Sequence, residues 1–173
     1  MGHRTGPIAR LLVLLLGTAS PALALDTPNE RVTLTGLTGV HLVVNEMSVE
    51  AVQQGLSRSS LETELASRLR QAGLRVLAPD EALTSVGRPT LEVRVSLLKS
   101  SEALQFYVYS VDLALRQQIR LARDRTIDSF AITWSDNREV GVVGATRLSA
   151  VRDAVRAKVE QFITAWQTVN QMR

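Results

Sequence analysis

The sequence contains no cysteine, and this absence excludes two classes of protein. No disulfide can form, so the packing of the core alone has to hold the fold. Attachment of a lipid needs a cysteine at the start of the mature chain. We therefore predict that the protein is not a lipoprotein.

Histidine is almost as scarce, with only His3 and His41 in 173 residues. His3 falls in a predicted leader, so His41 would have to act without a second histidine or a cysteine. We interpret it as a surface or edge-strand histidine, since metal and triad sites need partners. The sequence also lacks a nucleophile elbow, a phosphate loop and a dinucleotide fingerprint. These absences predict a non-enzymatic protein with no catalytic residues, no cofactor and no metal site.

Long apolar runs are missing after the first residues of the chain. The first 24 residues combine the basic residues Arg4 and Arg10, the apolar run Leu11–Leu16 and a small-x-small cleavage pattern at Ala22–Ala24. This order is typical of a secretory signal peptide. The alternative is an uncleaved anchor, but the run is far shorter than the roughly 20 residues that a membrane span needs. We predict cleavage after Ala24, export to the periplasm and no membrane span in the mature chain.

An excess of one charge is also absent once the leader is removed. The formal net charge of the whole chain is +3, and the leader carries two arginines and no acid, so the mature chain is left at +1. A nearly neutral protein gives no reason to expect nucleic acid as a partner. Hydrophobic residues make up 45% of the chain, enough for one folded domain. The oligomeric state cannot be read from these features.

The fold is organised around the stretch Gln105–Leu121, whose residues alternate between apolar and polar. A period of two over this length predicts a strand with one dry face and one wet face. Its length of roughly 55 Å also predicts a bend or bulge. If Leu121 faces Thr126 in the next strand, then Phe130, Ile132 and Trp134 all join the dry face. In the preceding hairpin, the preferred register sets Arg94 opposite Asp112.

The remaining elements complete an α+β prediction. We expect strands at residues 40–46, 74–77, 90–98 and 140–143, one helix after Ser59 with a capping box to Glu62, and a second helix starting near Leu148 or Ser149. Residues 25–39 form an extended lead-in and residues 40–173 a single domain. The predicted architecture is a two-layer sandwich, a mostly antiparallel meander with two amphipathic helices packed on one face.

The two faces of this sheet suggest two kinds of function. We expect most of the aromatic residues to fill the core and the polar face to remain open, with Ser96, Ser129 and Thr133 on it. We interpret Asp112 as an ion-pair partner of Arg94 or Arg116. The candidate partner surface consists of Arg94, Ser110, Asp112, Arg116 and Arg120.

We predict an exported accessory protein that binds an envelope protein through this open face or through an edge strand. The alternative is a module that binds a small molecule or lipid in a cavity between the carboxyl-terminal helix and the sheet, near Trp134 and Trp166.

Several short patterns resemble a family of uncharacterised bacterial proteins that carry signal peptides. The patterns are Leu37–Val44, Gly55-Leu56 with Leu61–Leu77, Tyr107–Val111, Thr133-Trp134, and Val140–Val155 continuing to Asn170. The order of elements is also similar to small envelope domains such as the amino-terminal domain of TolB. The resemblance implies a periplasmic location and a small α+β fold, and it implies no activity, cofactor or site residue.

Overall fold

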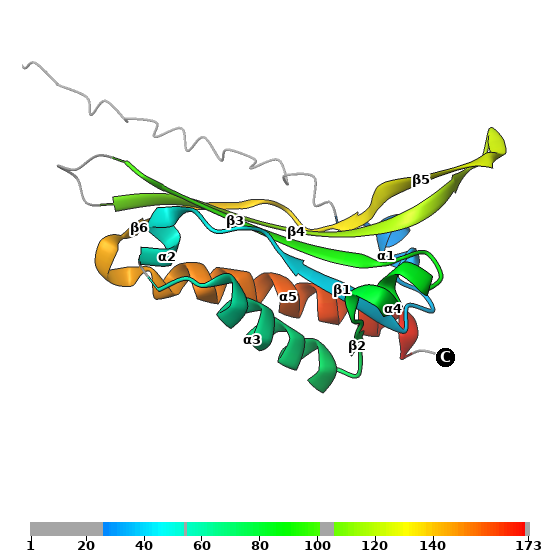
Figure 1. Cartoon of the computed structure of the whole chain (residues 1–173), viewed down its shortest axis with the longest axis horizontal. Helices are drawn as coiled ribbons and strands as arrows, with labels where there is room; N and C mark the ends of the chain where they lie inside the picture. The colour runs from blue at the N-terminus through cyan, green and yellow to red at the C-terminus, as the bar shows by residue number, and fades with distance from the viewer. Residues whose placement is uncertain (1–25, 54, 101–105, 172–173) are drawn as a thin grey trace, which may run out of the picture.

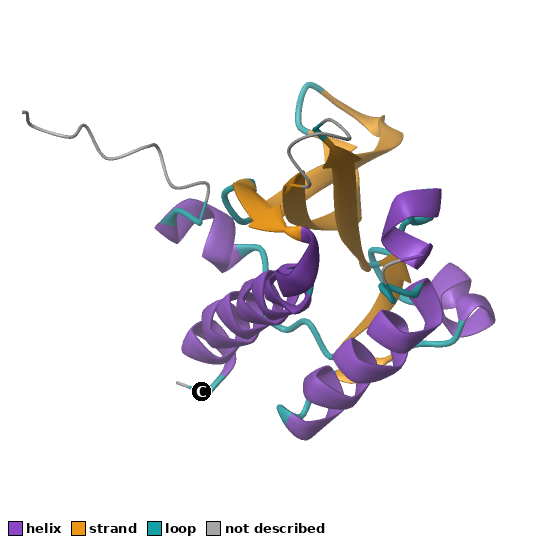
Figure 2. Ribbon diagram, turned by 90° about the vertical axis from the view of Figure 1, so that its left-hand side faces the viewer, coloured by secondary structure: helices purple, strands orange, loops and turns teal. Residues whose placement is uncertain are grey.

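The computed structural model describes residues 26–53, 55–100 and 106–171. A mixed, open sheet forms one layer and helices cover one side of it (Figure 1, Figure 2). The predicted α+β class is therefore confirmed. The predicted signal peptide, residues 1–24, lies outside the described residues and stays a prediction. Within the described ranges, no helix is both long enough and apolar enough to cross a membrane.

The sheet is built around its fourth strand. Its strands are β1 (Gly39–Val44), β2 (Arg75–Val76), β3 (Thr90–Lys99), β4 (Phe106–Leu121), β5 (Asp124–Ser135) and β6 (Glu139–Gly144). The order is β2-β1-β3-β4-β5, and β6 also pairs with β4. The meander β3-β4-β5 is antiparallel as expected. The pairing of β1 is different, because β1 runs parallel to both β2 and β3.

The helices are α1 (Pro28–Val32), α2 (Val49–Gln53), α3 (Arg58–Gln71), α4 (Pro79–Thr84) and α5 (Ser149–Asn170), with a short 3-10 turn η1 (Ala145–Arg147). The prediction of an extended lead-in at residues 25–39 is wrong for α1. Thr27 caps this helix, and Glu30 completes a capping box by accepting from the backbone N–H of Thr27. The long amphipathic helix begins at Ser149, as expected.

The cap predicted for the first amphipathic helix is wrong by two residues. Ser57 is the N-cap of α3, and its hydroxyl oxygen accepts from the backbone N–H of Ser60 at 3.1 Å. Ser59 lies inside the first turn instead. Both serines precede the same apolar stripe, so the capping-box pattern could not choose between them.

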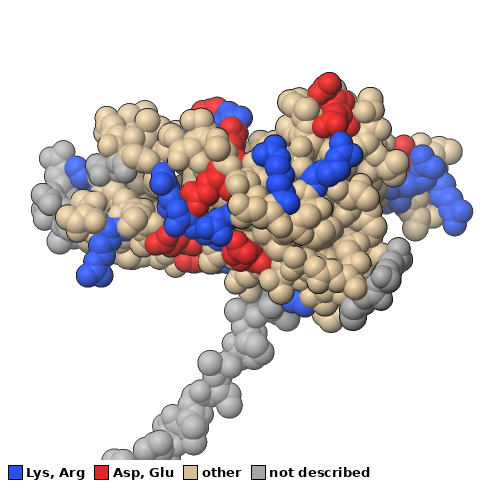
Figure 3. All heavy atoms as spheres, turned by 90° about the horizontal axis from the view of Figure 1, so that it is seen from below, with Lys and Arg blue, Asp and Glu red and all other residues tan. Residues whose placement is uncertain are grey.

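The core fills the space between the sheet and the helices α3 and α5. Trp134 of β5 and Phe162 of α5 are fully buried and meet edge to face, with ring centroids 5.1 Å apart. Opposite the sheet, the outer surfaces of α3 and α5 carry a mixture of acidic and basic side chains (Figure 3). Arg156 pairs there with Glu64, and Arg68 with Glu160 at 2.7 Å. These pairs hold the two helices side by side.

The register of the hairpin β3–β4 confirms that Arg94 lies opposite Asp112. The predicted register of the hairpin β4–β5 is wrong. Leu115 pairs with Trp134, but the next pair is Arg116 with Ile132, so Thr133 is an extra residue in β5. This bulge reverses the faces of the residues before it in the chain. Trp134 stays inside, while Phe130 and Ile132 turn to the opposite side of the sheet.

Candidate functional site

The side of the sheet that faces away from α3 and α5, here called the outer face, is the first candidate site (Figure 1). Even-numbered residues of β3 and β4 project from it, because odd-numbered residues such as Leu91 and Leu113 are buried in the core. All five residues of the predicted partner surface, Arg94, Ser110, Asp112, Arg116 and Arg120, lie on this face by register. The structure therefore brings these residues onto one surface.

Large apolar side chains on the outer face were not predicted. They are Leu98 of β3, Phe130 and Ile132 of β5, and Val140 and Val142 of β6, with exposed fractions of 69%, 44%, 55%, 64% and 67%. The outward orientation of Leu98 could have been predicted, because Leu98 follows the inward-facing Leu97 and successive strand residues face opposite ways. Phe130 and Ile132 could not be assigned without knowing the position of the bulge. Below, these five residues are called the apolar rim.

The orientation of β6 depends on Gly141. This glycine pairs with Tyr109 on the core side of the sheet, and a Cβ there would lie 2.6 Å from three atoms of the Tyr109 side chain. The Tyr109 hydroxyl donates to Glu139 Oε1 at 3.1 Å. Burial is the larger cause and this hydrogen bond the second cause of a raised pKa of Tyr109, so the phenol keeps its proton. With Gly141 facing the ring, Val140 and Val142 must face outward.

Charged side chains cross the middle of the outer face and separate the two ends of the apolar rim. This charged band consists of Glu92, Arg94, Asp112, Arg116 and Arg138. The expected pairing of Asp112 with Arg94 or Arg116 is wrong, because Asp112 accepts from Arg138 Nε at 2.8 Å. Arg138 belongs to the turn between β5 and β6 and reaches over β4 from there. Arg94 and Arg116 instead each contact Glu92, at 3.4 Å.

A notch opens in the charged band where β5 ends and β6 has not yet begun. Its volume is about 360 Å³, and it is lined by Arg94, Asp112, Leu113, Ala114, Ile132, Ser135, Asp136 and Arg138. Arg116 lies beside it, with its guanidinium carbon 5.2 Å from the centroid of the Phe130 ring. The notch therefore joins guanidinium groups to the apolar rim.

Lys158, in α5, fixes the turn that forms one wall of the notch. Its Nζ donates to the backbone oxygen of Asn137 at 2.6 Å and lies 2.9 Å from Asp136 Oδ2. Lys158 and Asp136 are both almost completely buried. Sequence reasoning missed this role, although a lysine within the apolar stripe of a helix could have indicated a buried ion pair.

Three residues expected on the polar face have other roles. Ser129 pairs with Ile119 and therefore faces the helix side, because the bulge reverses this part of β5. Thr133 is the bulged residue and accepts from Gln117 Nε2 at 2.7 Å. Arg120 lies on the outer face but is engaged by Asp128, with nitrogen–oxygen distances of 2.8 and 3.2 Å.

The far ends of β4 and β5 form an arm that projects beyond the helices (Figure 1). β5 is the last strand on this side of the sheet, and residues 124–130 are exposed. Near the base of the arm, the Thr33 hydroxyl donates to the Thr133 carbonyl oxygen at 3.1 Å, so α1 covers part of this edge. The rest of β5 offers backbone groups at an open sheet edge.

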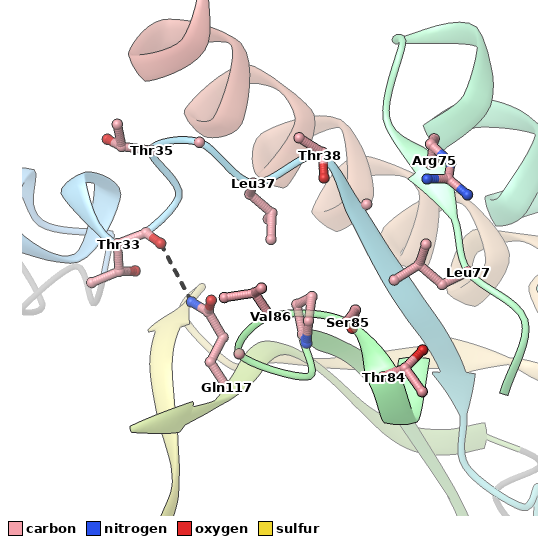
Figure 4. Close-up of a pocket in the computed structure, with 14 residues that line it drawn as sticks. Thr33, Thr35, Leu37, Thr38, Arg75, Leu77, Thr84, Ser85, Val86 and Gln117 are labelled. Atoms are coloured by element: carbon pink, nitrogen blue, oxygen red, sulfur yellow. Dashed lines mark hydrogen bonds between the residues drawn. The ribbon is translucent and has the colours of Figure 1, made fainter. Parts of the chain in front are cut away.

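A second cavity lies at the end of the sheet, between the residues after α1 and the loop after α4 (Figure 4). Its volume is about 490 Å³, and the hydroxyl-bearing residues Thr33, Thr35, Thr38, Thr84 and Ser85 are among those that line it. Two of the lining residues are connected by a hydrogen bond, in which Gln117 Nε2 donates to the Thr33 carbonyl oxygen at 3.3 Å. Such a cavity can donate and accept hydrogen bonds.

The backbone at the rim of this second cavity is strained. Gly87 and Arg88 are consecutive residues with positive φ, at 75° and 43°, immediately before Pro89. The conformation is unfavourable for Arg88. The backbone N–H of Gln118 donates to the Gly87 carbonyl oxygen at 2.7 Å and helps to hold this loop against β4. The charged lining residue Arg75 is paired with Glu81 at 3.0 Å, so the lining offers no acid–base pair of its own.

The remaining candidate residue is the histidine of the mature chain, His41. His41 lies on β1, which is flanked by β2 and β3, and its Nδ1 is 3.2 Å from the Leu77 carbonyl oxygen. The position of β1 inside the sheet makes the edge-strand expectation wrong, while the partly exposed side chain agrees with a surface histidine. Among the described residues, no group of three His, Cys, Asp or Glu is placed to hold a metal ion.

The alternative expectation, a ligand cavity near Trp134 and Trp166, gains no support from the packing. Trp134 is fully buried against Phe162, and Trp166 Nε1 donates to the Leu37 carbonyl oxygen at 2.8 Å. The side chains of the core occupy this space. The two cavities described above lie at the end of the sheet and on the outer face instead.

Comparison with known proteins gave one distant similarity. No family model matches the chain, and no curated protein matches it. Among solved structures, a PelC variant from Paraburkholderia phytofirmans, determined as a dodecamer, aligns with a TM-score of 0.41 and 15% sequence identity. The alignment covers 76% of this chain and 92% of that one. At this level, the similarity carries no argument about function. The resemblance to signal-bearing bacterial proteins stays a prediction.

Proposed function

We propose that the mature chain is an exported, non-enzymatic protein of the bacterial envelope that binds a protein partner through its outer face. The single observation that supports the proposal best is the apolar rim, in which five large side chains are 44–69% exposed on one side of one sheet. Scattered apolar residues are normal on a protein surface, but a group on one face is typical of an interaction site.

The composition of the outer face agrees with a protein partner. Apolar contacts supply most of the free energy of association, while charged groups between them set the orientation and the choice of partner. The free edge of β5 adjoins this face and can extend the interface by backbone pairing. Export is supported by the signal-peptide pattern in residues 1–24.

Site-specific photo-crosslinking in living cells tests this proposal. A photoreactive amino acid replaces Ile132 or Val142 on the outer face, and Gln161, which is exposed on α5, serves as the matched control. We expect both outer-face positions to give the same discrete adduct and Gln161 to give none. Adducts of equal yield at all three positions, or none at any, would contradict a binding site on the outer face.

A further inference from the structure

We propose that the outer face recognises its protein partner through a carboxylate that docks in the notch between Arg94 and Arg138. Apolar residues on either side of this acid cover the two ends of the apolar rim. This inference rests on the proposed function and adds the chemistry of the partner.

The charge balance of the charged band favours an acidic group. Three guanidinium groups, those of Arg94, Arg116 and Arg138, face the two carboxylates of Glu92 and Asp112. Arg94 and Arg116 share Glu92 through contacts of 3.4 Å, which are long for charged hydrogen bonds. The band therefore carries one uncompensated positive charge at the centre of the face.

The arginines also retain unused donors. A guanidinium group has five N–H donors, and the ion pair of Arg94 with Glu92 involves only one nitrogen of its guanidinium. The same holds for Arg138 and Asp112. Both side chains are more than 40% exposed, so their remaining donors are open to an arriving group. A carboxylate is the acceptor whose two oxygens match this fork of donors.

The shape of the notch suits one acidic side chain. Among its lining residues, Ala114 is small and lies on the outer face between the rows of Asp112 and Arg116, so it leaves space above β4. Lys158 holds the opposite wall through Asp136 and Asn137. The arginine on that wall, Arg138, is therefore positioned before the partner arrives, which lowers the entropy lost on binding.

The apolar rim specifies what surrounds the acid. Val140 lies beside Ser110, and Ile132 lies beside Arg116, so apolar groups flank the notch in both directions along β4. In an extended segment, residues two apart project to the same side. The partner segment should therefore present an acid with apolar residues two positions before and after it.

Peptide probes with a single varied residue test this inference on protein purified after export. The probes are Val-Thr-Glu-Thr-Val, acetylated at its amino terminus and amidated at its carboxyl terminus, and its versions with Gln or Lys in place of Glu. Binding is followed by methyl NMR of Ile132, Val140 and Val142. We expect saturable shifts with the Glu peptide, little with the Gln peptide and none with the Lys peptide. Raising the salt concentration should weaken binding of the Glu peptide, because salt screens exposed ion pairs.

Matched variants locate the effect. Arg94→Gln and Arg138→Gln should each lower the affinity for the Glu peptide about tenfold, which corresponds to the loss of one charge-assisted hydrogen bond. Arg75→Gln should change nothing, because Arg75 is about as exposed as Arg138 but lies at the second cavity. Arg94 and Arg138 variants that bind normally would contradict the notch as the site.

Three further results would overturn the inference: equal binding of the Glu and Gln peptides, the absence of shifts with any peptide, or binding of phosphatidylglycerol vesicles in preference to the Glu peptide. The crosslinking at Ile132 and Val142 is judged separately. If crosslinked adducts form there but the peptides bind irrespective of charge, the proposed protein-binding function stands and only the inference of a docking carboxylate is rejected.

Discussion

Lys158 is the residue that connects the core to the outer face. Breaking a buried ion pair leaves an uncompensated charge, which costs about 3–5 kcal/mol. We expect Lys158→Met to lower the free energy of unfolding by about this amount, because Asp136 loses its ion-pair partner and the Asn137 carbonyl oxygen loses this donor. Urea unfolding followed by tryptophan fluorescence measures the change.

The other lysine of the mature chain provides the control for this prediction. Lys99 is exposed at the end of β3, so Lys99→Met should change the free energy of unfolding by no more than about 0.5 kcal/mol. The double variant Asp136→Leu/Lys158→Met should recover part of the loss. An equally small effect of Lys158→Met would show that the pair does not hold the turn.

Asp26 makes the stability of the protein depend on pH. Its carboxylate accepts from Arg31 Nε and from Trp134 Nε1, both at 2.8 Å. Burial alone raises the pKa of Asp26, but these hydrogen bonds outweigh burial and hold the pKa below its ordinary value of 3.8. The ionised form is therefore favoured in the folded state. Its contribution is complete above pH 3.8 and is lost as the pH falls below this value.

The variant Asp26→Asn isolates this contribution. At pH 7 we expect it to be less stable than the wild type by about 1.5–3 kcal/mol, the usual value for hydrogen bonds to a charged group. The difference between the two proteins should shrink as the pH is lowered from 5 to 2. A difference that stays constant over this range would mean that ionisation of Asp26 is not linked to folding.

At the scale of elements, the bulge at Thr133 decides which aromatic residues stabilise the core. Phe130 and Phe162 look equally apolar in the sequence, but Phe130 is 44% exposed and Phe162 is fully buried. We expect Phe162→Ala to lower the free energy of unfolding by about 3–5 kcal/mol. Phe130→Ala should cost less than about 1 kcal/mol. Chemical denaturation of both variants measures the contrast, and equal losses would place Phe130 in the core.

The same bulge explains how far the sequence could predict the site. Alternation correctly assigned Arg94, Asp112 and Arg116 to one face, because period two persists through β3 and β4. It failed for Phe130 and Ile132, because one extra residue reverses the parity of a strand and leaves no mark in its composition. Arg138 was missed for another reason: its role depends on how a turn folds over a neighbouring strand.

The parallel pairing of β1 was also beyond the reach of local patterns. Alternation shows that Gly39–Val44 is extended, but it gives no direction relative to β3. The connection through α3 makes the parallel arrangement possible, since parallel neighbours need a crossover. The meander was easier, because its strands are consecutive and joined by short turns.

At the scale of the whole molecule, the outer face should bind amphipathic anions even without its partner. The fluorescent probe ANS combines an apolar ring system with a sulfonate, matching the apolar rim and the charged band. We expect the native protein to enhance ANS fluorescence, and the variant Ile132→Gln/Val142→Gln to lose most of the enhancement while keeping its stability. The helix-face variant Gln161→Ala should behave as the wild type. An undiminished signal in the double variant would place the probe elsewhere.

The two ends of the described chain are fastened together. Asn170, in the last turn of α5, accepts from the Gly36 backbone N–H at 2.8 Å and donates to the Leu34 carbonyl oxygen at 2.9 Å. These partners are separated by 134 and 136 residues, whereas β3 and β4 are near neighbours in sequence. Closing a long loop costs more entropy than closing a short one.

Because these contacts close the longest loop considered, we expect the segment around α1 to be the last part of the protein to fold. Pulsed hydrogen exchange during refolding should protect the amides of β3 and β4 first and the Gly36 amide later. Asn170→Ala should speed the unfolding of the segment that includes α1 and leave the protection of the hairpin unchanged. We propose that the chain is exported from its amino terminus. The contacts of Gly36 and Leu34 with Asn170 can then form only after almost the entire chain has crossed the membrane.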